Sequence, residues 1–122
     1  MESEGKPYDL AERTFQFALS VRLFFRQHKW DPVSWTDVTQ VIRSSGSVAA
    51  NFIEANEGLS TDDSLYRFRL CKKEARESGL WLQLIEDTNP VNQEQEQQFT
   101  ALKQEASELV KILATIIRNK TK

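Results

Sequence analysis

The last third of the chain carries a pattern of apolar residues that an α-helix places on one side. The apolar positions recur at alternating steps of three and four residues, as Phe99, Leu102, Ala106, Leu109, Leu113 and Ile116. A helix turns once in about 3.6 residues, so these side chains form one narrow seam. Glutamine and glutamate occupy many of the positions between them. The segment is therefore predicted to be an outer helix that packs along its seam and exposes its opposite side to water.

Three earlier segments also have apolar residues at helical spacing. The predicted helices cover residues 9–28, 34–56, 61–88 and 91–119, between a disordered leader at 1–8 and a frayed tail at 120–122. Pro32, Gly58 and Pro90 lie at or next to the connections, and these residue types are common where helices end. Short connections favour helices that run antiparallel to their neighbours. We therefore expect one all-α domain, an antiparallel up-down-up-down four-helix bundle.

Two serines and one glycine make more local predictions. Ser34 and Ser60 are expected to cap the second and third helices, Ser34 as part of a capping box with Asp37. Gly46 lies inside the second helix, where a glycine costs about 1 kcal/mol relative to alanine. Because apolar residues keep their helical spacing on both sides of Gly46, we expect an unbroken helix that a neighbouring element approaches closely.

Composition excludes several classes of protein. With 4 glycines and 3 prolines, the chain has too few turn residues for an all-β domain. Lys and Arg number 16 against 18 Asp and Glu, so the net charge of −2 argues against a polybasic, histone-like protein. No apolar run approaches the roughly 20 residues that cross a bilayer. The single cysteine and the absence of a secretory signal pattern favour a cytoplasmic location.

The residue pattern contains no recognisable catalytic or metal-binding constellation. His28 and Cys71 lie far apart and do not have the spacing of zinc ligands. Glu54, Glu57 and Glu77 could pair as acid and base, but no nucleophile, metal ligand or second histidine accompanies them. We therefore expect no metal, no cofactor and no enzymatic activity.

A polar stripe runs along the second predicted helix. Its members share one arc of the helix: Gln40, Arg43, Ser44, Ser47, Asn51 and Glu54. The stripe is either an ordinary solvent-exposed face, a ligand-binding surface or a packed interface with internal hydrogen bonds. Small residues and apolar flanks favour the last, because buried polar groups are tolerated when they are paired. The predicted structural or oligomer-specifying network comprises Arg43, Ser47, Asn51, Glu54 and, on the third helix, Glu77.

The third predicted helix carries a cationic face. It consists of Arg69, Lys72, Lys73 and Arg76. One interpretation is a solvated face that neighbouring acids balance. The other is a binding track for phosphates, which an oligomer would repeat around its axis, and whose affinity would weaken as salt is added.

The same helix carries a second apolar surface, away from its main apolar face. Trp81, Leu84 and Leu70 form this candidate interface. Tryptophan is enriched among residues that anchor protein interfaces. The alternative is that Trp81 packs against the first or fourth helix of its own chain.

Two longer runs resemble a known family. Residues 45–57 (SGSVAANFIEANE) and 71–82 (CKKEARESGLWL) are similar to the four-helix-bundle proteins encoded in intervening sequences of bacterial 23S rRNA genes. The resemblance covers the first three helices and, more weakly, the fourth. It implies a small bundle that commonly assembles into a ring-shaped homopentamer with a central channel.

One branch of that superfamily is similar to the accessory variability determinant of diversity-generating retroelements. The resemblance implies that this branch binds nucleic acid and a reverse transcriptase through basic surfaces. Those accessory proteins are strongly basic, whereas this chain has a net charge of −2. The sequence therefore favours a non-catalytic oligomeric scaffold, with a homopentamer expected and proteins as its partners. The alternative is an accessory protein that binds RNA or DNA, with a reverse transcriptase as partner.

Overall fold

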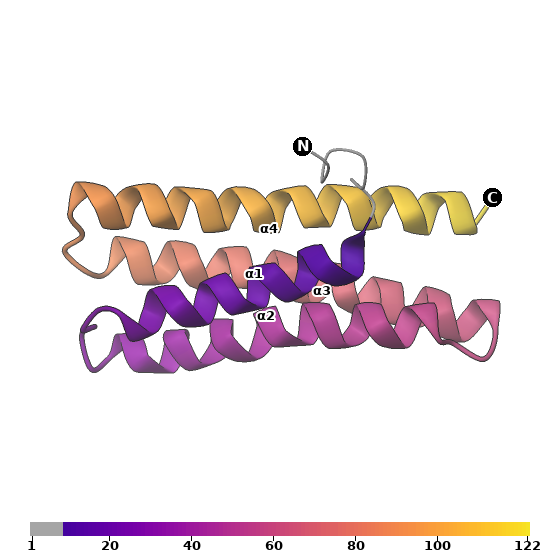
Figure 1. Ribbon diagram of the computed structural model, residues 1–122, viewed down its shortest axis with the longest axis horizontal. Coiled ribbons are helices and arrows are strands. Elements are labelled where there is room, and N and C mark those ends of the chain that lie inside the picture. Colours follow the sequence, from indigo (N-terminus) through magenta and orange to yellow (C-terminus); the bar gives the residue numbers. More distant parts are fainter. Residues whose placement is uncertain (1–8) are drawn as a thin grey trace.

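The computed structural model describes residues 9–122, which form helices and connecting loops without any strand. The helices are α1 (Leu10–Arg26), α2 (Ser34–Asn56), α3 (Thr61–Asp87) and α4 (Gln93–Lys120). The all-α prediction is confirmed for these residues. Each connection joins helix ends on the same side of the molecule, so the chain passes back and forth along its long axis (Figure 1). The leader expected at 1–8 lies outside the described residues.

Local hydrogen bonds explain where three of the helices begin. The side chain of Ser60 accepts a hydrogen bond from the Asp63 amide at 3.1 Å, as expected of the cap of α3. At the start of α4, Asn92 and Gln95 form a reciprocal capping box. Asp9 caps α1 by accepting from the Glu12 amide at 3.2 Å. Each cap satisfies an amide that has no partner within its helix.

The prediction of a capping box at Ser34 is wrong. Ser34 is the first residue of α2, and Val33 precedes it without any capping hydrogen bond from its side chain. The hydroxyl of Ser34 instead accepts a hydrogen bond from Asn89 Nδ2 at 2.8 Å. Asn89 Oδ1 also accepts from the Asp31 amide at 3.1 Å. Asn89 therefore joins the α1–α2 connection to the end of α3.

An aromatic cluster fills the core at this end of the molecule. Phe24 and Phe25 of α1, Trp30 of the following connection and Phe99 of α4 pack mostly edge to face. The centroid of Phe99 lies 4.9 Å from that of Phe24 and 5.8 Å from that of Trp30. The buried Trp30 donates its indole N–H to the carbonyl of Phe25 at 3.1 Å. The cluster links α4 to α1 where the two helices approach each other.

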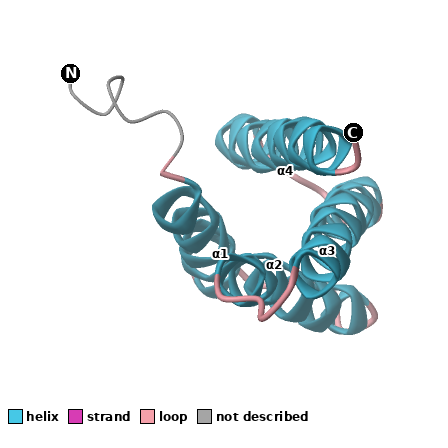
Figure 2. Cartoon of the chain, turned by 90° about the vertical axis from the view of Figure 1, so that its right-hand side faces the viewer, coloured by secondary structure: helices cyan, strands magenta, loops and turns pink. Residues whose placement is uncertain are grey.

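The four helices are not packed equally against one another. α3 packs extensively against both α2 and α4, whereas α1 contacts α4 sparsely. An end-on view shows α1 and α4 standing apart on one side of the bundle, with α3 on the other side (Figure 2). This opening positions the groove described below.

Gly46 lies where α1 crosses α2. α2 continues through Gly46, and the guanidinium of Arg22 lies directly over it. Arg22 Nη2 donates to the Ile42 carbonyl at 2.9 Å, and Nη1 donates to the Ser45 hydroxyl at 3.3 Å. A Cβ atom at position 46 would lie 2.9 Å from Arg22 Nη2. The close approach expected from the sequence is therefore confirmed.

Replacing Gly46 by alanine should stabilise the protein less when Arg22 is present than when it is absent. In the wild-type background, the methyl group displaces the guanidinium and the gain in helix propensity, about 1 kcal/mol, is offset by lost hydrogen bonds. In an Arg22→Ala background, Gly46→Ala should raise the free energy of unfolding by about 1 kcal/mol. Urea unfolding of the two single variants and the double variant measures this coupling. Equal effects in both backgrounds would contradict it.

Candidate interaction surfaces

Polar side chains join α2 to α3 along a line that we call the polar seam: Arg43, Asn51, Arg67, Glu74 and Glu77. Arg43 Nη2 lies 3.3 Å from Glu74 Oε1 and 4.0 Å from Glu77 Oε1. Asn51 Oδ1 accepts from Arg67 Nη1 at 3.3 Å, and its Nδ2 donates to the Ser47 carbonyl. Glu74 is buried, so its carboxylate needs this partner. Three of the expected residues therefore lie in the polar seam. Arg43 and Asn51 of α2 bind side chains of α3, and Glu77 of α3 lies 4.0 Å from Arg43.

Two expected members of the network take other places. Ser47 contributes its backbone carbonyl, and Glu54 is exposed near the end of α2. The carboxylate of Glu54 forms no hydrogen bond or ion pair with another residue in the part of the chain that the structure describes. Glu74 is not among the residues expected in the network, although it lies four residues before Ser78 in the run that resembles the known family. The buried hydroxyl of Ser78 donates to the Glu74 carbonyl and shares a 2.7 Å hydrogen bond with Ser44.

The cationic face of α3 is largely open to solvent. Arg69, Lys73 and Arg76 are exposed, and Lys72 is half-buried. Lys73 Nζ lies 3.7 Å from Glu77 Oε2. Over residues 9–122, the other three form no ion pair. They therefore remain available to a negatively charged partner.

The apolar surface of α3 is divided between the core and the solvent. Trp81 is half-buried and packs against the core, and its indole N–H is buried without a hydrogen-bond partner in the described residues. Leu70 is half-buried as well, whereas Leu84 remains 39% exposed. Leu80, which is not among the residues expected at this interface, is 52% exposed. The exposed apolar residues of this surface are therefore Leu80 and Leu84, one helical turn apart.

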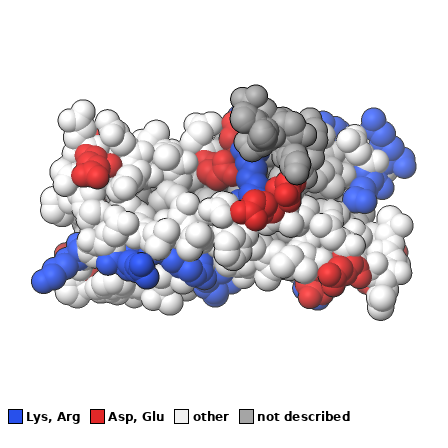
Figure 3. Space-filling view, in the orientation of Figure 1, with Lys and Arg blue, Asp and Glu red and all other residues white. Residues whose placement is uncertain are grey.

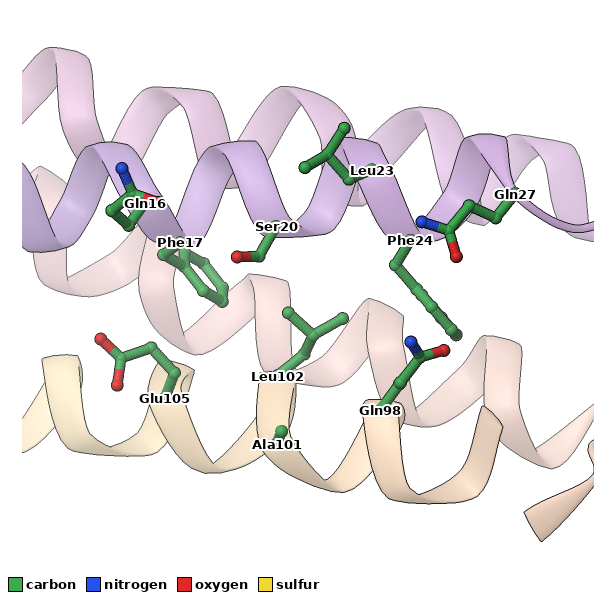
Figure 4. A pocket seen from close by; sticks show the side chains of 10 residues that line it. All are labelled: Gln16, Phe17, Ser20, Leu23, Phe24, Gln27, Gln98, Ala101, Leu102 and Glu105. Atoms are coloured by element: carbon green, nitrogen blue, oxygen red, sulfur yellow. The ribbon is translucent and has the colours of Figure 1, made fainter. Parts of the chain in front are cut away.

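A groove of about 380 Å³ lies between α1 and α4. Its floor is apolar, because Phe17, Phe24 and Leu102 are buried beneath it. Polar side chains from both helices border the floor, and they reach into the space from opposite sides (Figure 4). The remaining lining residues are Gln16, Ser20, Leu23, Gln27, Gln98, Ala101 and Glu105. We call this the α1–α4 groove.

Acidic residues lie at one end of the α1–α4 groove, where Glu105 lines it and Glu12 and Glu108 follow one helical turn beyond the lining. On the face of the molecule that shows α1 and α4, acidic atoms lie over α4 and near the start of α1, whereas a row of Lys and Arg atoms runs along the lower left edge (Figure 3). Glu105 binds Arg13 through two hydrogen bonds, of 2.7 and 3.0 Å. This hydrogen bonding raises the pKa of Arg13, and the nearby charge of Glu108 adds to the effect. Because Glu105 and Arg13 neutralise each other, the negative charge at this end of the groove comes from Glu12 and Glu108, which lie just beyond the lining residues.

Other chemistry is limited in the described part of the chain. Across residues 9–122, no group of His, Cys, Asp and Glu side chains is arranged to hold a metal ion. Nor does any helix there combine the length and the apolar character needed to cross a membrane. Cys71, a candidate nucleophile by residue type, is fully buried and donates its thiol hydrogen to the Val48 carbonyl at 3.2 Å.

Comparison with known proteins adds two findings. A family model described as "23S rRNA-intervening sequence protein" matches residues 8–115. The chain is also similar to a crystal structure from Bacteroides thetaiotaomicron, a protein of unknown function from the S23 ribosomal protein family. The two are 26% identical with a TM-score of 0.71, over 88% of this chain and 96% of the other. The search of curated proteins gave no match.

Proposed function

The chain belongs to the 23S rRNA-intervening sequence protein family, and from this membership we propose that it is a non-catalytic subunit of a cytoplasmic homo-oligomeric scaffold. One observation carries the proposal: Leu80 and Leu84, one helical turn apart on α3, are 52% and 39% exposed. Adjacent exposed apolar side chains are typical of surfaces that bind other proteins. A second copy of the chain would cover them.

The scaffold is a ring, with five copies favoured. Its building block is an antiparallel up-down-up-down bundle, in keeping with the back-and-forth course of the chain (Figure 1). The family resemblance described above supports a homopentamer with a central channel. The polar seam contributes specificity, because Arg43 is half exposed and its ion pair with the buried Glu74 fixes how α2 and α3 present their shared surface.

The assembly is tested by measuring its mass in solution. Native mass spectrometry or light scattering at micromolar concentration should give five times the mass of the chain. A monomer would overturn the scaffold proposal. Another number of copies would overturn the pentamer while supporting self-association.

A second candidate function is binding of RNA or DNA as an accessory protein, with a reverse transcriptase as partner. The observation that favours it is a set of cations on α3 that form no ion pair within residues 9–122: Arg69, Lys72 and Arg76. Lys73 lies beside them. This function ranks second because the net charge is −2.

Binding of nucleic acid is tested by titrating labelled single-stranded and duplex RNA at low and moderate salt. Under this function, affinity falls steeply as salt is added. Changing Arg69, Lys72, Lys73 and Arg76 to glutamate should abolish it. Absence of binding at low salt, or binding that survives the four changes, would reject this function.

A further inference from the structure

The α1–α4 groove and the outer face of α3 are complementary surfaces. We propose that the groove of one copy receives the α3 face of a second copy, in a head-to-tail interface. The inference rests on the proposed homo-oligomer and specifies which surfaces meet. Its occupant is a second copy of this chain, because the charge and the apolar pattern that the groove requires are both present on α3.

The groove offers an apolar floor with acidic residues at one end. Phe17 and Phe24 lie beneath it, and the exposed methyl group of Ala101 leaves the α4 side open. Glu12 and Glu108 supply negative charge nearby, while Arg13 is held by Glu105. A complementary partner therefore has apolar side chains with a cation at one end.

The α3 face has that pattern. Arg76, Leu80 and Leu84 follow one another at steps of four residues, so they share one side of the helix. The leucines are 52% and 39% exposed, and Arg76 has no ion-pair partner among the described residues. At 1.5 Å per residue, this row is about 12 Å long, and the groove from Gln16 to Gln27 is about 16 Å long. The row therefore fits within the length of the groove.

The two surfaces lie on different sides of one bundle. α3 is opposite the opening between α1 and α4 (Figure 2). A contact between the groove of one copy and α3 of the next leaves one free surface at each end of the pair. Such a contact repeats, and it forms a ring when the rotation between copies closes. The interface covers Arg76, so the closed assembly cannot present this cation to RNA.

Two variants each disrupt one of the two proposed surfaces and leave the other intact. Ala101→Glu adds bulk and negative charge to the groove, and Leu80→Glu places a carboxylate on the α3 face. Both positions are exposed, so folding should be preserved, which circular dichroism and thermal unfolding verify. Each variant alone should associate at least about tenfold more weakly than the wild type, as expected when a central interface contact is lost. The matched controls Ala50→Glu on α2 and Leu59→Glu in the α2–α3 turn, both at exposed positions, should assemble like the wild type.

Mixing the two variants is the decisive measurement. Leu80→Glu keeps an intact groove and Ala101→Glu keeps an intact α3 face, so an equal mixture should form a dimer that neither variant forms alone. Native mass spectrometry distinguishes this dimer from both monomers. If the mixture stays monomeric, head-to-tail pairing is overturned.

Other outcomes separate this inference from the proposed function. If both variants keep the wild-type mass, the interface is overturned and the scaffold proposal stands. A monomeric wild type would overturn both. If an intact assembly binds labelled RNA and Arg76→Glu abolishes that binding, Arg76 faces solvent and the proposed interface is wrong.

Discussion

Replacing Phe99 by alanine is expected to lower the free energy of unfolding by about 3–5 kcal/mol. Phe99 is 0% exposed, and its ring packs against Phe24, Phe25 and Trp30. The substitution removes apolar surface from the core and leaves a cavity. The neighbouring aromatic rings can fill this cavity only in part, because their own helix and connection hold them in place. The loss should also weaken the contact between α1 and α4, because few other residues join these helices.

The matched control is Phe15→Ala on α1. Phe15 is 55% exposed, so truncation to alanine should change the free energy of unfolding by about 0.5 kcal/mol or less. Urea unfolding at one fixed protein concentration measures both variants, since self-association makes stability depend on concentration. Similar losses for the two variants would contradict the assignment of Phe99 to the centre of the core.

Helical spacing predicts most of the fold because burial in a helix depends on neighbours close in sequence. The seam foreseen on α4 is buried from Phe99 to Leu113, whereas Ile116 is half-buried. Ser34 shows where local reasoning fails. Its sequence resembles a cap, yet its hydroxyl accepts from Asn89, 55 residues away. Only the meeting of two connections at one end of the bundle creates that hydrogen bond.

Residue spacing predicts the α2 side of the polar seam but not the α3 residues that pair with it. The spacing on α2 identifies Arg43 and Asn51 as residues of one face. It does not determine which residues of α3 lie opposite them, because the offset between α2 and α3 follows from the turn and from packing. Arg43 therefore lies nearer to Glu74, at 3.3 Å, than to the expected Glu77, at 4.0 Å.

The α1–α4 groove had no signal in the sequence. Gln16, Ser20 and Gln27 have the spacing of an ordinary solvated face of a helix. They line a groove only because α4, which begins more than sixty residues after α1 ends, stands apart from α1. Surfaces formed by two helices distant in sequence depend on the tertiary arrangement, which local periodicity does not encode.

The stability of the protein should fall in alkaline solution because of Cys71. Complete burial raises the pKa of the Cys71 thiol from 9.0 to about 12. The unfolded chain loses this proton above pH 9, whereas the folded chain retains it until about pH 12. Over that range the unfolded state binds fewer protons, so this one group should lower the free energy of unfolding by about 1.4 kcal/mol per pH unit. Below pH 9 its contribution is constant.

The Cys71→Ala variant isolates this effect from the titration of lysine and tyrosine side chains. Urea unfolding from pH 8 to 11 should give a steeper decline for the wild type than for the variant, and parallel curves would contradict the buried thiol. Reaction with a thiol reagent at pH 8 gives an independent measurement. The raised pKa alone reduces the thiolate fraction by about a thousandfold, and burial also blocks the reagent. The folded protein should therefore react only as fast as it opens, whereas the chain in urea should react at once.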